Sequence, residues 1–225
     1  MQFVYDENAS KEILEVGEDN FKYLIKARRH NIGDIIHFRN LEDSFIYEYE
    51  LFEITKKSAS FRMLSKEEKV IGNDKSLNLV WCVVDPKTVE KSIPSLNELG
   101  LEKITFIYCD YSQKNFKLNI DKLNKILINS SSQCGRSSII KLEIYKNSLE
   151  KYLQENPENT YFLDFSTNDV TDKKNDIKNL VLGCEGGFSK LERNLISDDK
   201  KVGFKSSLIL KSETAAISAV SKILI

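Results

Sequence analysis

Two short segments near the end of the chain carry the residues best suited to chemistry. The first reads Val-Leu-Gly-Cys-Glu-Gly-Gly-Phe over residues 181–188, and the second reads Ser-Ser-Leu-Ile-Leu-Lys-Ser-Glu-Thr-Ala-Ala over residues 206–216. Each joins an apolar run to a carboxylate, Glu185 in the first and Glu213 in the second. Because glycine has no side chain, the three glycines of the first segment let the backbone approach a ligand closely. The two segments therefore predict a ligand site with carboxylates at its edge.

Alternating strand and helix patterns surround these segments and must position them. Strand patterns occur at residues 77–84, 104–109, 160–165, 180–182 and 207–210. Helical patterns occur at residues 89–99, 120–128, 149–154 and 212–224, and a capping-box pattern begins at Ser189. Such alternation is typical of a mostly parallel sheet with helices on its faces. Ligands of these folds bind beyond the carboxyl ends of the strands, which is where the glycine segment is expected.

The first part of the chain has a different pattern. Short runs rich in aromatic and β-branched residues occupy positions 2–5, 34–38, 45–54 and 60–64, and a basic, helical piece interrupts them at 20–30. Several short strands of this kind suggest a small barrel. The polar stretch 65–76 is interpreted as the linker to the second part. The fold class is therefore α+β with two domains, of which we expect the first over residues 1–70 and the second over 71–225.

Composition limits the classes of function. The chain has 225 residues, of which 41% are hydrophobic and 30% charged, and its net charge is −1. This balance gives no support to a strongly basic nucleic-acid binder, although a local basic patch remains compatible with it. No apolar run reaches the length of about 18 residues that a membrane helix needs, so no membrane partner is expected.

Cysteine and histidine usage argues against a metal site. The four cysteines include no C-x-x-C pair, and only two histidines could add ligands, so we expect no bound metal. Cys82 and Cys109 lie in apolar runs and are interpreted as small buried hydrophobic residues. The amino terminus lacks the pattern of a secretion signal. We therefore expect a cytoplasmic protein with reduced cysteines.

The two segments together resemble the SPOUT-class RNA methyltransferases, most closely the RsmE family, which methylates the N3 nitrogen of a uridine in 16S ribosomal RNA. That family has Gly-Pro-Glu-Gly-Gly-Phe-Ser where this chain has residues 183–189, and Ile-Leu-Arg-x-Glu-Thr-Ala where it has residues 209–215. Weaker matches lie upstream in the same order, at Glu-Leu-Gly (98–100), Gln-Cys-Gly-Arg (133–136) and the basic element 23–34. The resemblance therefore touches nearly the whole chain.

The resemblance implies a specific architecture. The first domain would be a PUA-like β-barrel that binds RNA, and the second an α/β SPOUT domain whose carboxyl-terminal segment forms a trefoil knot. The knot loops would bind S-adenosylmethionine as the methyl donor, and a homodimer would complete each site. The partner implied is 16S ribosomal RNA or the small ribosomal subunit.

The resemblance also implies roles for individual residues. The residues implied to bind the donor are Phe165, Leu182, Gly183, Glu185, Gly186, Gly187, Ser206, Leu208, Ile209 and Leu210. The residues implied to act catalytically, as a base or as electrostatic partners, are Glu213, Lys211 and Glu185. We favour Glu213 as the base, although a carboxylate there could also complement the dipole of the last helix. The residues implied to contact RNA are Lys22, Lys26, Arg28, Arg29 and Arg136.

The chain departs from the family pattern at several positions. Cys184 replaces a proline, Lys211 an arginine and Ser206 a glycine, and Lys211 acts as a point charge because it lacks the bidentate geometry of arginine. Two alternatives stay open, the first because the sequence does not fix the RNA substrate and the second because of the replacements at Lys211 and Ser206. One is a SPOUT enzyme that modifies another RNA such as a transfer RNA, and the other is a non-catalytic RNA-binding factor for ribosome assembly.

Overall fold

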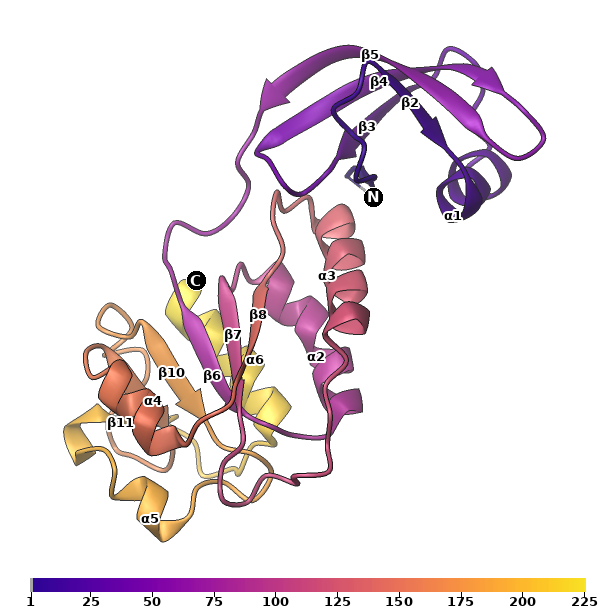
Figure 1. The fold of residues 1–225 in the computed structure, drawn as a ribbon. Helices are drawn as coiled ribbons and strands as arrows, with labels where there is room; N and C mark the ends of the chain where they lie inside the picture. The colour runs from indigo at the N-terminus through magenta and orange to yellow at the C-terminus, as the bar shows by residue number, and fades with distance from the viewer. Residues whose placement is uncertain (1) are drawn as a thin grey trace. The chain divides into compact units, whose positions relative to one another are not determined.

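The structure is a computed structural model that describes residues 2–225. The chain divides into two compact units (Figure 1). The first unit comprises the residues up to Gly72 together with Ile128–Ile139, and the second comprises Asn73–Leu127 and Ile140–Ile225. Each unit contains one β-sheet.

The first unit is built on a curled five-stranded sheet (Figure 1). Its strands are β1 (Val4–Tyr5), β2 (Ile13–Val16), β3 (Ile35–Arg39), β4 (Phe45–Ile54) and β5 (Ala59–Glu68), in the order β1-β3-β4-β5-β2. The long hairpin β4–β5 contains register shifts between Glu48 and Tyr49 and between Leu51 and Glu53. Such bulges bend a strand and increase its twist, which accounts for the curl of the sheet.

Aromatic residues form the core of the first unit. Phe38 packs edge-on against both Tyr49 and Phe61, with ring centroids 5.4 Å and 5.2 Å apart. The helical segment α1 (Glu18–Phe21), which continues into the π-helix η1 (Lys22–Ala27), adds Phe21 and Leu24 to the same core. The first sheet therefore buries one face against this segment.

The second unit is an all-parallel sheet of six strands. Its strands are β6 (Asn78–Cys82), β7 (Lys103–Ile107), β8 (Lys141–Tyr145), β9 (Thr160–Leu163), β10 (Asn179–Leu182) and β11 (Lys201–Val202), in the order β11-β9-β10-β6-β7-β8. The central strands β6 and β10 are apolar and almost fully buried, as expected for a parallel sheet with covered faces. The predicted parallel sheet is confirmed.

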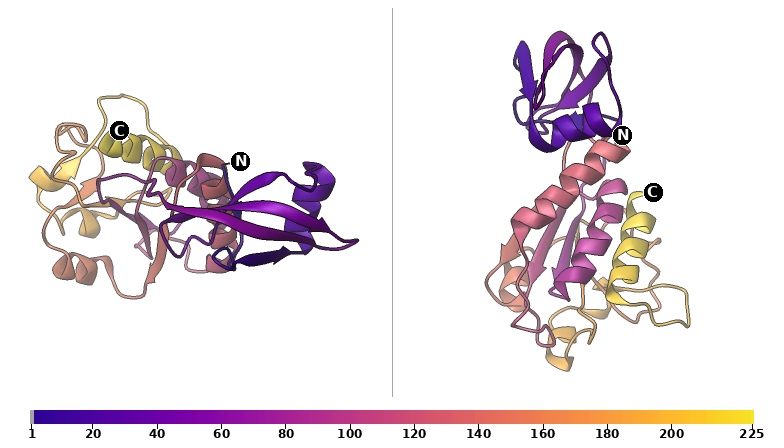
Figure 2. Two further views of the ribbon diagram at one scale, coloured as in Figure 1. Left: turned by 90° about the horizontal axis from the view of Figure 1, so that it is seen from above. Right: turned by 90° about the vertical axis from the view of Figure 1, so that its right-hand side faces the viewer.

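Helices connect the strands of this second sheet. They are α2 (Pro86–Glu98), α3 (Ile120–Cys134), α4 (Leu149–Glu155), the short α5 (Lys190–Arg193), the 3-10 turn η2 (Asp198–Lys200) and α6 (Ser212–Leu224). Figures 1 and 2 show α2 and α6 against one face of the sheet and α4 against the other. The apolar face of α6, which includes Ala216, Val220 and Ile223, is buried as its spacing predicts.

Some of the expected elements are wrong. Residues 207–210 form no strand: they lie in the loop between β11 and α6, with a bend at Ser207 and Leu208, and pair with no strand within residues 2–225. The strands β2, β8 and β11 were not predicted. The expected linker 65–76 begins too early, since β5 continues to Glu68 as the charged end of an exposed hairpin. No helix among the described residues combines the length and apolarity that crossing a membrane requires.

The cysteines also differ from expectation. Cys82 and Cys109 are buried as predicted, but they are joined in a disulfide that links the ends of β6 and β7, with their Cα atoms 5.6 Å apart. The expectation that both are free thiols is therefore wrong. The two residues are 27 positions apart in the sequence, and only the parallel pairing of β6 with β7 brings them together.

Candidate functional site

A cavity of the second unit lies beyond the carboxyl ends of β9 and β10 and has a volume of about 920 Å³. Three segments distant in sequence surround it: residues 163–166 after β9, 182–188 after β10, and 204–215 at the start of α6. Every residue predicted to bind the donor or to act catalytically lines this cavity, namely Phe165, Leu182, Gly183, Glu185, Gly186, Gly187, Ser206, Leu208, Ile209, Leu210, Lys211 and Glu213.

The glycine segment forms a tight turn directly after β10. The amide of Gly187 donates to the carbonyl oxygen of Cys184 at 2.9 Å, and Gly187 adopts a left-handed backbone with φ +69°. A Cβ atom on Gly183 would lie 2.9 Å from the Cα of Gly187. Such a contact is too short for any side chain, so the turn requires glycine at position 183.

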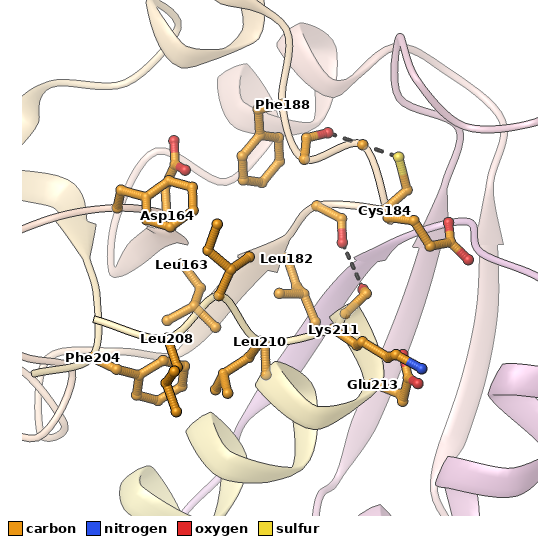
Figure 3. Close-up of a pocket in the computed structure, with 18 of the residues that line it drawn as sticks. Leu163, Asp164, Leu182, Cys184, Phe188, Phe204, Leu208, Leu210, Lys211 and Glu213 are labelled. Atoms are coloured by element: carbon orange, nitrogen blue, oxygen red, sulfur yellow. Dashed lines mark hydrogen bonds between the residues drawn. The ribbon is translucent and has the colours of Figure 1, made fainter. Parts of the chain in front are cut away.

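The hydroxyl of Ser212 connects the glycine segment to the start of α6. It donates to the carbonyl oxygen of Gly183 at 2.7 Å and accepts from the indole Nε1 of Trp81 at 2.8 Å (Figure 3 draws the first of these bonds). All three groups are buried, and Trp81 lies in the core as its apolar surroundings predict. Because buried polar groups are costly to leave unpaired, this short chain of bonds fixes the distance between β6, β10 and α6.

Two carboxylates and one ammonium stand at the edge of the cavity. Lys211 and Glu213 both extend from the start of α6 (Figure 3). The exposed Glu185 accepts a long hydrogen bond of 3.4 Å from the backbone amide of Asp85, the N-cap of α2. No hydrogen bond or ion pair within residues 2–225 occupies the carboxylate of Glu213, so it is available to a ligand.

Apolar side chains gather on the other side of the same cavity. Figure 3 shows Leu163, Leu182, Phe204, Leu208 and Leu210 grouped there. Leu208 is 75% exposed and the adjacent Ile209 is 81% exposed, so two neighbouring apolar side chains of the cavity lining face the solvent. A flat, largely apolar group such as a purine would fit against this wall. The cavity thus combines an apolar wall, a backbone turn and charged groups at its edge.

An ion pair at the cavity wall was not predicted. The Nε of Arg193 donates to Oδ2 of Asp164 at 2.6 Å, and this carboxylate raises the pKa of the Arg193 guanidinium. Asp164 directly follows β9 and is largely buried. Because Arg193 lies on α5, the pair joins the segment after β9 to the segment after β10. The 29-residue separation of its two members left no signal in the sequence.

Gly203 is a second feature that the sequence analysis missed. A Cβ atom there would lie 2.7 Å from the carbonyl oxygen of Ser166 and 2.9 Å from that of Asp164. The chain therefore passes so close to the segment after β9 that only glycine fits. An isolated glycine beside an apolar residue, Phe204, was the available sequence signal.

The capping box predicted at the start of α5 is confirmed, and it has a further role. The buried carboxylate of Glu192 accepts from the amide of Ser189 at 2.8 Å and from the amide of Asp110 at 2.9 Å. Asp110 follows β7, and its carboxylate also accepts a bond from the hydroxyl of Ser189. These bonds attach the segment after the glycine turn to the loop after β7.

Cys184 lies within the glycine turn. Burial raises the pKa of its thiol, which fits its predicted role as a small filler.

The predicted RNA-binding residues belong to the first unit. Lys22 and Lys26 lie on η1, and Arg28 and Arg29 follow it directly. All four are exposed. Arg136 is instead buried, and its Nε donates to the hydroxyl of Ser138 at 3.2 Å. Its contact with RNA stays a prediction.

Comparison with known sequences identifies the family. The family model described as RNA methyltransferase domain matches residues 72–224. The chain is 35% identical over 224 residues to the ribosomal RNA small subunit methyltransferase E of Helicobacter pylori, covering 98% of both chains. It is 28% identical over 237 aligned positions to the protein of the same name from Aquifex aeolicus, again covering 98% of both.

Comparison with solved structures agrees at the level of the fold. A methyltransferase of Legionella pneumophila, solved with bound S-adenosylmethionine, superposes with a TM-score of 0.79 at 23% identity, covering 99% of this chain and 96% of that one. The ribosomal RNA small subunit methyltransferase E of Neisseria gonorrhoeae, also solved with S-adenosylmethionine, gives a TM-score of 0.77 at 15% identity, covering 98% and 95%. Sequence and fold lead to one assignment: the chain belongs to the RNA methyltransferase family, among the relatives named ribosomal RNA small subunit methyltransferase E.

Proposed function

We propose that the protein transfers a methyl group from S-adenosylmethionine to the N3 nitrogen of a uridine in 16S ribosomal RNA. The observation that carries this proposal is the convergence of the glycine turn, the loop 204–210 and Glu213 on one cavity of about 920 Å³. The relatives named for small-subunit ribosomal RNA support the choice of substrate. The small ribosomal subunit in the cytoplasm is therefore the expected partner.

The residues present fit the methyl donor. The volume lies within the range of roughly 300–1,000 Å³ typical of cofactor sites. Leu163, Phe204 and Leu208 offer an apolar surface to the adenine, and the turn at Gly183 and Gly187 offers backbone groups that no side chain hides. The exposed Phe165 would cover the bound donor from the solvent side.

The chemistry requires an acceptor nitrogen without its proton. When bound, the donor supplies an electrophilic methyl group on a sulfonium. The imide proton of uridine must leave before or during attack, and Glu213 is proposed as the base that takes it. Glu185 and Lys211 flank the position of the base as electrostatic partners. The larger contribution of the protein is to hold donor and acceptor in line.

The architecture implied by the family is part of the same proposal. Residues 1–70 would form the PUA-like RNA-binding domain, and residues 71–225 the SPOUT domain, with a trefoil knot around the donor. A homodimer would cover the exposed side chains of Leu208 and Ile209 and complete each site. Lys22, Lys26, Arg28 and Arg29 would contact phosphates of the RNA.

The test is methyl incorporation from labelled S-adenosylmethionine into small ribosomal subunits that lack this modification, followed by digestion to nucleosides. We expect N3-methyluridine as the product. Donor binding without incorporation would contradict the substrate and direct the search to another RNA, such as transfer RNA. Absence of both would contradict the enzymatic function and favour an RNA-binding assembly factor.

A further inference from the structure

A second cavity, of about 410 Å³, lies entirely within the first unit. The side chains around it come from the amino-terminal strand, the π-helix with the turn that follows it, and β3. Phe3, Leu24 and Ile36 are buried and form its apolar floor, whereas Ile35 is 53% exposed at its mouth. The volume falls within the range of roughly 300–1,000 Å³ that pockets for small ligands span.

The backbone beside this cavity is unusual in two respects. Residues Lys22–Ala27 form a π-helix, which is rare in proteins and is found frequently at functional sites. Arg29, just beyond the helix, adopts a left-handed backbone with φ +60°. Glycine is the residue favoured in that conformation. The next glycine in the sequence, Gly33, stands four positions after Arg29. This conformation costs a non-glycine residue free energy, so Arg29 is a candidate for a functional role.

The polar groups of the cavity suit a nucleotide. The guanidinium of Arg28 lies 5.3 Å from the ring centroid of Tyr23, and its Nε donates to the Tyr23 hydroxyl at 2.8 Å. Aromatic rings and guanidinium groups are the two kinds of side chain on which unpaired bases stack. No carboxylate within residues 2–225 forms an ion pair with Arg28 or Arg29, so both charges are available to phosphate.

His30 adds an oriented polar group to the cavity. Its Nδ1 lies 2.9 Å from Oδ2 of Asp34. The backbone amide of Asn31 and the His30 ring lower the pKa of the Asp34 carboxyl, which is therefore ionised at neutral pH and only accepts. Nδ1 thus carries the proton, and the ring orientation is fixed by this bond.

We propose that this cavity receives one unpaired nucleotide of the RNA, with the base between Tyr23 and Ile35 and the phosphate at Arg28 and Arg29. The inference rests on the proposed function, because it takes the partner to be RNA. The inference adds that the first unit binds a base in a pocket, in addition to contacting the phosphate backbone. A base paired in a duplex cannot enter such a pocket, so the nucleotide must be single-stranded or displaced from its stack.

The test uses the full-length protein and a short single-stranded oligouridylate that carries a photoreactive thiouridine. Ile35→Trp places a large ring at the mouth of the cavity. Ile13→Trp is the matched control, because Ile13 is equally exposed (50%) on β2 of the same sheet but does not line the cavity. We expect Ile35→Trp to lower the affinity about fivefold or more, as the loss of one stacked base would. We expect Ile13→Trp to bind like the unchanged protein.

Two results support or overturn the pocket. Crosslinks to residues 23–36, absent in Ile35→Trp and present in Ile13→Trp, would support it. Equal affinity of the two variants, or crosslinks elsewhere only, would overturn it. Neither result depends on catalysis, so methylation of small subunits, measured separately, distinguishes a failure of the pocket from a failure of the proposed function. Unchanged calorimetric binding of S-adenosylhomocysteine by Ile35→Trp shows that the second unit stays folded.

Discussion

The two cavities of this protein are built from different parts of the chain. The cavity of the second unit depends on backbone, since Gly183, Gly187 and Gly203 stand where an added Cβ atom would collide or meet an unfavourable conformation. The cavity of the first unit depends on side chains, above all Tyr23 and Arg28. A site built from backbone is most sensitive to a Cβ atom added at these glycines, whereas a site built from side chains is most sensitive to the loss of those side chains. Ser206 lines the cavity of the second unit where the family has a glycine, so position 206 is one at which this chain accepts a side chain.

The largest expected effect is on the rate of methyl transfer. It tests Glu213, the side chain proposed to act as the base at the cavity of the second unit. We expect Glu213→Gln to lower kcat by about 100-fold or more, the range of roughly 10²–10⁴ that general acid–base catalysis contributes. Single-turnover methylation of small subunits measures it. Glu185→Gln is the control at the same edge and should retain more activity. Equal rates for the unchanged protein and Glu213→Gln would remove Glu213 as the base.

The next effect tests whether the donor cavity is built from backbone. We expect Gly183→Ala to weaken binding of S-adenosylhomocysteine by about 100-fold, or ~2.7 kcal/mol, because its methyl group would displace Gly187 from the turn. Isothermal calorimetry measures it. Gly186→Val should also block binding, because its Cβ atom would lie 3.1 Å from the Cβ of Tyr111, an atom held in place by the backbone. Gly72→Ala, which meets no atom within 4 Å, is the control. Unchanged affinity in Gly183→Ala would contradict the role of the turn.

The sequence predicted the backbone site better than its surroundings. Glycines beside an apolar run predict a close backbone approach without knowledge of the fold. Residues 182–187, 206 and 208–213 line one cavity, and the binding of a ligand to them stays a prediction. The pair Asp164–Arg193 and the disulfide of Cys82 with Cys109 depend on which strands are neighbours. Strand order in a parallel sheet is set by long-range packing, which the local pattern does not encode. The short edge strand β11 was missed for the same reason, since its two residues carry no periodicity.

A smaller effect is expected from the bonds that hold the backbone site together. Ser212→Ala leaves the Trp81 indole and the Gly183 carbonyl without their shared partner. The loss of such a buried hydroxyl costs about 1–3 kcal/mol in the free energy of unfolding. Urea denaturation followed by Trp81 fluorescence measures it, since Trp81 is the only tryptophan. Ser218→Ala, on the same helix, is the control. A midpoint equal to that of the control would contradict the bridging role.

The smallest effect is expected at the first unit, where single charges contribute modestly. We expect Arg29→Glu to weaken RNA binding about tenfold and to reduce its salt dependence, while binding of S-adenosylhomocysteine is unchanged. Lys57→Glu, the same charge change in the turn between β4 and β5, is the control. Arg29→Gly separates charge from folding, because glycine adopts the left-handed backbone of position 29 without strain and should leave the unit at least as stable. If Arg29→Gly binds RNA as tightly as the unchanged protein, the arginine is not held in that conformation for the sake of RNA. If it binds weakly but melts no earlier, the first unit recognises RNA through side chains, in contrast to the backbone recognition proposed for the donor.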